Sequence, residues 1–189
     1  LSAITLTGEN ANIINYRYAL ENKYAQWDQE LDAREQAVTQ KEAERLGYKP
    51  CCFVAGTPVA TPHGYTPIEQ LKVGDQVLTR LEEAAAHDVV FAAAVTATHQ
   101  RTDQAIYTLV LSKTTPTGIQ NETLHVTAGH PFFVPKANGF IPLKDLQVGD
   151  ELTSQSGEPL HVQRIELEQV QGLTYNLTVE QGHTFFVGR

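Results

Sequence analysis

From residue 52 onward, hydrophobic and polar positions alternate in short runs that favour β-strands. These runs are rich in β-branched and aromatic residues and are separated by glycine, proline and asparagine. They are TPVAT, DQVLT, AIYTLVLS, TLHVT, PFFV, HVQRIEL, LTYNLTV and TFFVG. Regular spacing of strand-like runs and turn residues is typical of an all-β domain. We therefore predict an all-β fold for this part of the chain.

The first 50 residues show a different periodicity. Apolar positions recur there at three- and four-residue steps, which predicts an amphipathic helix. These positions are Ile13, Tyr16, Leu20, Tyr24, Trp27, Leu31 and Val38. Gly47 and Pro50 end the pattern. The sequence thus predicts two parts, a helical upstream segment at residues 1–50 and a β domain at residues 52–189.

The predicted β domain contains an internal repeat. Residues 55–78 (AGTPVATPHGYTPIEQLKVGDQVL) align with residues 128–152 (AGHPFFVPKANGFIPLKDLQVGDEL), with two extra residues in the second copy before its VGD motif. Glycines and prolines coincide in the two copies, and because they fix unusual backbone angles, the same local path is expected twice. The repeat predicts two related halves about a pseudo-twofold axis. Asp75 and Asp150, in the two VGD motifs, are expected to close turns by binding local backbone N–H groups.

Composition and charge narrow the classes of partner and the chemical state of the cysteines. The net charge of −8 argues against nucleic acid as a partner, because phosphate binding requires a basic surface. No apolar run approaches the length of about 18 residues that a membrane span needs. The two cysteines, Cys51 and Cys52, are adjacent. Neighbouring Cα atoms lie about 3.8 Å apart, below the roughly 4.4–6.8 Å of disulfides, so we interpret the pair as two thiols.

The repeat also shows where its two copies differ. Cys52 aligns with His125, and Thr57 aligns with His130. If the halves interlock about an axis, the segments CCFVAGT and LHVTAGH meet near it. One half then supplies a thiol, and the other supplies Thr127 with two histidines. The sequence thus predicts an asymmetric reactive site on a symmetric frame.

Three motifs of the chain together resemble the Hint superfamily of inteins, hedgehog autoprocessing domains and bacterial relatives. CFVAGTPVATPHGYTPIEQLKVGDQVL resembles the first block of that superfamily, LHVTAGHPFFV its T-x-x-H block, and TYNLTVEQGHTFFVG its penultimate block. The motifs occur in the expected order over residues 52–188 and are most similar to the pretoxin Hint domains of bacterial polymorphic toxins. The resemblance implies a flat, horseshoe-shaped all-β disc.

The resemblance also implies a catalytic set. Carried over by position, Cys52 is the first residue of the domain and its nucleophile. Thr127 and His130 are the T-x-x-H pair, and His183 is the histidine of the later block. Asn176 stands where many inteins have aspartate, which leaves its acid–base role open, and we assign it an accessory role.

These residues would cleave the chain at its own peptide bond between Cys51 and Cys52. The Cys52 thiol would attack the Cys51 carbonyl and form a thioester, since a thiol with a pKa of about 8.5 is partly ionised near neutrality. The departing amide nitrogen must gain a proton, a role that an imidazole with a pKa of about 6.5 suits and that we assign to His130. Thr127 and backbone N–H groups would stabilise the oxyanion or hold the peptide bond out of plane, and His125 is an accessory candidate.

The thioester would then hydrolyse, exchange with another thiol or enter a splicing step. Splicing in these families requires a terminal His-Asn pair, whereas this chain ends in FFVGR, so we expect a truncation before that block. The resemblance implies single-turnover autoproteolysis without a cofactor, acting on the flanking segments of the same chain and releasing a downstream toxin. It places the protein in the bacterial cytoplasm before export, or within a larger secreted or delivered toxin.

Two other classes of function stay open. Cys51, Cys52, His125 and His130 offer the thiolate and imidazole ligands of a zinc site, although adjacent cysteines differ from the C-x₂-C spacing of structural zinc sites. Alternatively, the domain is a catalytically inert spacer or interaction module. Cleavage by added thiols, or its absence, separates these classes from autoproteolysis.

Overall fold

The computed structural model describes residues 2–8, 51–81 and 89–189, and all structural statements below refer to these residues. They fold into two six-stranded sheets, ordered β4-β3-β12-β1-β8-β9 and β10-β11-β2-β7-β6-β5. The strands are β1 (Ala3–Leu6), β2 (Phe53–Val54), β3 (Pro58–Thr61), β4 (Gly64–Pro67), β5 (Gln76–Thr79), β6 (Phe91–Thr115), β7 (Gly118–Thr127), β8 (Pro131–Val134), β9 (Gly139–Pro142), β10 (Glu151–Thr153), β11 (Pro159–Val179) and β12 (Thr184–Val187). Short 3₁₀ turns are η1 (Ile68–Gln70), η3 (Pro135–Ala137) and η4 (Leu143–Asp145). The predicted all-β class is confirmed, and no helix in the described ranges is long and apolar enough for a membrane crossing.

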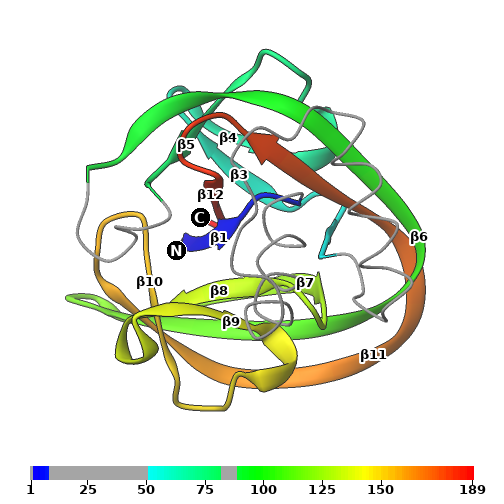
Figure 1. Cartoon of the computed structure of the whole chain (residues 1–189). Coiled ribbons are helices and arrows are strands. Elements are labelled where there is room, and N and C mark those ends of the chain that lie inside the picture. The colour runs from blue at the N-terminus through cyan, green and yellow to red at the C-terminus, as the bar shows by residue number, and fades with distance from the viewer. Residues whose placement is uncertain (1, 9–50, 82–88) are drawn as a thin grey trace, which may run out of the picture.

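The two longest strands, β6 and β11, form the rim of the molecule. They pair antiparallel from His161 opposite Ser112 to Val179 opposite Val95. Figure 1 shows them curving side by side around the shorter strands. Their register shifts at several places, and because an extra residue bends and twists a strand, these shifts allow the curvature. The result is the horseshoe-shaped disc that the resemblance implied.

The two copies of the repeat follow the same backbone path. Ile68 N–H donates to the carbonyl of Thr57 at 2.9 Å, and in the second copy Leu143 N–H donates to the carbonyl of His130 at 2.8 Å. The 3₁₀ turns η1 and η4 occupy the same place in the two copies. In the first sheet, the hairpins β3–β4 and β8–β9 lie at opposite ends, with β12 and β1 between them. The predicted duplication is therefore visible in both hydrogen bonds and topology.

The two VGD motifs form matching turns. Asp75 Oδ2 accepts a hydrogen bond from Lys72 N–H at 2.8 Å, and Asp150 Oδ2 accepts one from Gln147 N–H at 2.8 Å. The glycines before these aspartates have φ values of 95° and 96°, in the left-handed region that favours glycine. Both aspartates thus close turns, as the sequence predicted.

Residues 3–6 form a strand, in contrast to the helical segment predicted for residues 1–50. β1 pairs with β12 over Ala3–Leu6 and contacts β8 through Thr5 opposite Phe132. Two of its residues are β-branched, and the strands on both sides of it need a hydrogen-bonding partner, so tertiary pairing decides this conformation. The amphipathic pattern over residues 13–38 lies outside the described residues, and the domain boundary at residues 50–52 stays a prediction.

The core draws large side chains from both halves and from β2. Phe53 is fully buried, and its ring lies 6.2 Å from the rings of Phe132 and Phe185, edge-on to both. Such aromatic contacts add to the stabilisation from burial. Because Phe53 directly follows Cys52, this packing fixes the position of the cysteine pair in the centre of the disc.

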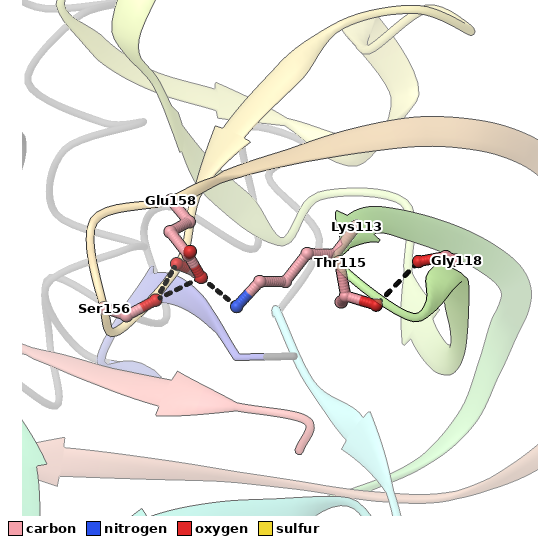
Figure 2. A network of polar contacts seen from close by, with 6 residues as sticks. Lys113, Thr115, Gly118, Ser156 and Glu158 are labelled. Carbon is pink, nitrogen blue, oxygen red and sulfur yellow. Dashed lines mark hydrogen bonds and ion pairs between the residues drawn. The ribbon is translucent and has the colours of Figure 1, made fainter.

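A network of polar contacts links β6 with the loop before β11. Figure 2 shows Lys113 of β6 pointing toward Glu158, which precedes β11 and also accepts a hydrogen bond from Ser156 at 3.1 Å. Beside it, Thr115 Oγ1 donates to the carbonyl of Gly118 at 2.7 Å and closes the β6–β7 turn. The Lys113 ammonium group holds the pKa of Glu158 below its usual value. Since Glu158 is exposed, this ion pair orients the loop more than it stabilises the fold.

Candidate active site

The short strand β2 holds the cysteine pair between two longer strands. Phe53 pairs with Val126 of β7 on one side, and Val54 pairs with Thr174 of β11 on the other. Cys52 directly precedes this strand, and both cysteines are about 1% exposed. The 51–52 peptide bond is therefore buried and fixed from both sides.

Both polar atoms of the 51–52 peptide unit contact side chains. Cys52 N–H donates to Thr127 Oγ1 at 2.9 Å, and Thr127 N–H donates back to the Cys52 carbonyl at 3.0 Å. The carbonyl oxygen of Cys51 accepts a hydrogen bond from Asn176 Nδ2. The Asn176 amide has a defined orientation, because its Oδ1 accepts from Leu177 N–H at 2.7 Å. Two side chains thus hold the bond at its nitrogen and at its oxygen.

Thr127 and Asn176 contact opposite ends of the 51–52 peptide unit. Sequence reasoning gave Thr127 a role at the oxyanion or in holding the peptide bond out of plane, and in the structure its hydroxyl oxygen accepts from the amide nitrogen of Cys52. The group that donates to the carbonyl oxygen, where negative charge develops during acyl transfer, is Asn176. The residue types alone did not predict which atom of the peptide unit each side chain contacts, because that depends on which face of β7 and β11 each side chain occupies.

The two thiols differ in their surroundings. Burial raises the pKa of Cys52 to about 11, while a hydrogen bond with Thr174 and the charge of Arg101 act in the opposite direction. Burial also raises the pKa of Cys51, and the neighbouring Cys52 adds to that rise. The Cys51 thiol donates to the Gly129 carbonyl at 3.0 Å. Cys52 therefore has two groups beside it, Thr174 and Arg101, that favour its thiolate.

His130 is completely buried beside the cysteine pair. Its ring centroid lies 4.2 Å from that of Phe53, and its backbone N–H donates to the Thr127 carbonyl at 3.1 Å, which closes the T-x-x-H turn. Burial lowers the pKa of His130 to about 3, and the backbone of Cys51 partly opposes this shift. Its Nε2 atom contacts the hydroxyl of Thr5 on β1. The imidazole is therefore neutral at physiological pH.

The other two histidines predicted from sequence have different environments. The side chain of His183 is exposed, its backbone has a φ of 56°, and its carbonyl accepts from Thr7 N–H at 2.8 Å. Partial burial lowers the pKa of His183, while the backbone of Val179 raises it. The side chain of His125 is 43% exposed, and its Nδ1 lies 2.5 Å from Glu168 Oε1. Both contrast with the buried groups around the 51–52 bond, and their predicted roles stay predictions.

Comparison with protein families gives a match over most of the chain. The model of the pretoxin Hint domain matches residues 58–189. The chain belongs to the pretoxin Hint domain family. The matched range begins at Pro58, so Cys52 lies just upstream of it. Comparison with curated proteins gave no significant match.

Solved structures similar to this Hint domain are intein-like. A bacterial intein-like domain from Clostridium thermocellum shares 28% identity with a TM-score of 0.60, over 73% of this chain and 98% of that one. The gp41-1 intein shares 16% identity with a TM-score of 0.55, over 75% and 100% of the two chains. A DnaB intein from Synechocystis shares 15% identity with a TM-score of 0.56, over 72% and 96%. Family and fold together make this a domain of the self-processing type.

Three residues near the reactive groups of this Hint domain were not predicted. Thr174 and Arg101 face each other across β11 and β6 and both influence the Cys52 thiol. Thr5 contacts His130 from a segment that the sequence assigned to an upstream helix. Thr174 lies within the TYNLTV motif, which was a usable signal. No signal in the sequence pointed to Arg101 or Thr5, because only the pairing register of the strands brings them to the site.

The zinc alternative gains no support from this geometry. Within residues 2–8, 51–81 and 89–189, no group of three or more histidine, cysteine, aspartate or glutamate side chains is arranged to hold a metal ion. His125, one of the four suggested ligands, contacts Glu168 instead.

Proposed function

We propose that the chain is an autoproteolytic domain in which the Cys52 thiol cleaves the 51–52 peptide bond. One observation carries this proposal: the buried bond is held at its nitrogen by Thr127 and at its oxygen by Asn176. His130 lies in the same buried region. Attacking atom and target belong to adjacent residues, so proximity supplies part of the acceleration.

The reaction balances with groups of the chain alone. Cys52 Sγ forms a bond to the Cys51 carbonyl carbon, and Asn176 Nδ2 donates to the oxygen as it becomes negative. The C–N bond then breaks, which leaves a thioester and a free amine on Cys52. The thiol loses one proton and the amine gains one. Neutral His130 is suited to accept the first and deliver the second, because a neutral imidazole has a free lone pair.

Release of the upstream segment requires a second nucleophile. Water or an external thiol attacks the thioester carbonyl, the C–S bond breaks, and the Cys52 thiol is regenerated. Residues 1–51 and 52–189 then become separate polypeptides. In a longer parent chain, the family description as a pretoxin domain favours a toxin as the flanking cargo, with this domain acting on its own flanking segments.

Dithiothreitol and mass spectrometry test the proposal directly. We expect added thiol to convert the intact chain into fragments 1–51 and 52–189. Cys52→Ala should abolish the conversion, whereas Cys51→Ala should retain it. Cleavage that survives Cys52→Ala but not Cys51→Ala would show that the nucleophile is Cys51 and not Cys52. An intact mass under all conditions would favour the inert spacer.

A further inference from the structure

The centre of the first sheet is occupied by a strand that precedes the proposed cleavage point. β1 pairs along Ala3–Leu6 with β12 and also contacts β8. Figure 1 shows it in the middle of the disc, next to β12. Ala3, Ile4 and Thr5 are each at most 1% exposed. A segment from upstream of residue 51 is therefore part of the core of the domain.

Contacts at both ends of β1 extend this attachment. Ser2 Oγ donates to the Gly188 carbonyl at 2.8 Å, and Gln155 N–H donates to the Ser2 carbonyl at 2.9 Å. At the other end, Thr7 N–H donates to the His183 carbonyl at 2.8 Å. Loss of β1 would leave the facing edges of β12 and β8 with unpaired backbone groups inside the disc. The slot between these strands is thus a binding site for an extended peptide.

We propose that β1 stays bound between β12 and β8 after the 51–52 bond is cut, so that processing yields a nicked two-chain complex. This inference rests on the cleavage proposed above. It means that thioester cleavage alone does not separate the upstream segment from the domain. Separation requires a competing strand or unfolding, because the backbone hydrogen bonds of β1 do not depend on the 51–52 bond.

Gel filtration of the cleaved full chain tests this retention. After treatment with dithiothreitol, fragments 1–51 and 52–189 should elute together in buffer and separately in concentrated guanidinium chloride. Separate elution in buffer would overturn the inference. Ile4→Asp places a charge in the buried cluster with Phe133 and Phe186 and should release the fragment. Val73→Asp, the same kind of change at a residue that is 64% exposed, should leave co-elution intact.

Hydrogen exchange on the uncleavable Cys52→Ala chain tests the docking without any cleavage. The amides of β1 should exchange as slowly as those of β12, since both belong to the same ladder. Exchange of β1 at the rate of an unfolded peptide would overturn the inference, whether or not the wild type cleaves. If Ile4→Asp fails to fold, the elution of the cleaved wild-type chain and the hydrogen exchange of the Cys52→Ala chain still test the retention of β1.

A second, independent observation concerns the side chain of Thr5. Its hydroxyl contacts His130 Nε2 and also donates to the Pro131 carbonyl at 2.7 Å. A hydroxyl has a single hydrogen, and a carbonyl oxygen can only accept. The Thr5 oxygen must therefore accept from Nε2–H of His130. His130 Nδ1 is buried and has no hydrogen-bond partner among the described residues, so it bears the free lone pair.

We infer that Thr5 is a positioning residue that holds His130 in the Nε2–H tautomer. The nitrogen left available for proton transfer is then Nδ1, which is buried and has no hydrogen-bond partner among the described residues. Without the Thr5 hydroxyl, Nε2–H would be a buried donor without a partner, so the imidazole would shift toward the other tautomer. The upstream segment thus supplies a residue to the site that cleaves it.

Nitrogen-15 NMR of the histidine rings, with His130 assigned by His130→Thr, tests this role. The Cys52→Ala chain and its Thr5→Ser variant should show protonated Nε2 and bare Nδ1, and Thr5→Val should shift toward protonated Nδ1. With Cys52 present, Thr5→Val should slow thiol-induced cleavage about 10- to 100-fold, and Thr5→Ser should restore it. Protonated Nδ1 in the parent chain, or an unchanged tautomer in Thr5→Val, would overturn the inference. Because the NMR measurement does not depend on cleavage, it tests the role of Thr5 even when no variant cleaves.

Discussion

The two copies of the repeat share a backbone but differ at one turn. In the first copy, Thr57 N–H donates to the Val54 carbonyl at 3.3 Å, and in the second copy His130 N–H donates to the Thr127 carbonyl at 3.1 Å. The Thr57 hydroxyl closes its own turn by donating to the same Val54 carbonyl at 2.7 Å. The imidazole of His130 instead reaches Phe53 and Thr5. The same turn thus carries a locally bonded hydroxyl in one half and a buried imidazole beside the cysteine pair in the other.

Under the proposed function, this difference gives a duplicated frame a single reactive centre. Backbone hydrogen bonds set the path in both halves, so a side chain at the turn is free to change. Burial then decides what that side chain does. His130 is 0% exposed and has its pKa lowered to about 3, whereas Thr57 satisfies its hydroxyl locally.

The largest effect is expected when the second turn is made like the first. His130→Thr should slow thiol-induced cleavage by about 100-fold or more, because general acid–base catalysis contributes roughly 10²–10⁴ in rate. Thr57→Val, the matched change in the first half, should leave the rate within about threefold and cost about 1 kcal/mol in unfolding free energy. Mass spectrometry over time measures the rates. Equal rates in wild type and His130→Thr would remove the contrast.

A smaller loss is expected at the carbonyl oxygen. Asn176→Asp keeps the size of the side chain but replaces the donor to the Cys51 carbonyl with an acceptor. Cleavage should slow about 100-fold, the usual cost of losing one oxyanion donor. Asn121→Asp makes the same substitution at an exposed position of β7 and should have no effect. An unaffected rate in Asn176→Asp would mean that the hydrogen bond does not persist as the oxygen becomes negative.

The free energy of unfolding in acid should also reflect the difference between the two turns, because the second turn contains the buried His130. Burial lowers the pKa of His130 from 6.5 to about 3, so the unfolded chain binds a proton between these values that the folded chain excludes. His130 therefore lowers the free energy of unfolding by about 1.4 kcal/mol per pH unit as pH falls from about 6.5 toward 3. Urea unfolding at several pH values should show a flatter acid dependence for His130→Thr. If the free energy of unfolding depended on pH in the same way in the wild type and in His130→Thr, a neutral, buried imidazole would be contradicted.

The smallest effects should be equal in the two halves. Asp75→Ala and Asp150→Ala each remove one hydrogen bond to a backbone N–H at 2.8 Å. Each should reduce the free energy of unfolding by about 1 kcal/mol, since exposed turn hydrogen bonds contribute on that order. Neither should change the cleavage rate. Unequal losses in urea unfolding would show that the turns differ more than their backbone suggests.

Local patterns in the sequence determined the β class, the duplication and the main reactive candidates. Alternating runs with glycine and proline turns predicted strands, because side-chain periodicity follows local geometry. The repeat predicted matching turns at Asp75 and Asp150, which the hydrogen bonds confirm. Adjacent cysteines and the T-x-x-H motif pointed to Cys52, Thr127 and His130, and these lie together in the buried centre of the disc.

The groups that lie beside Cys52, Thr127 and His130 depend on the tertiary structure. Thr127 contacts the nitrogen of the 51–52 bond and Asn176 its carbonyl oxygen because of the strand faces they occupy, and strand register fixes those faces. The placement of Thr5 required a strand from the first residues to enter the sheet between β12 and β8. No local pattern encodes such long-range pairing, because its stabilisation comes from burial and backbone hydrogen bonds that form only once the disc closes.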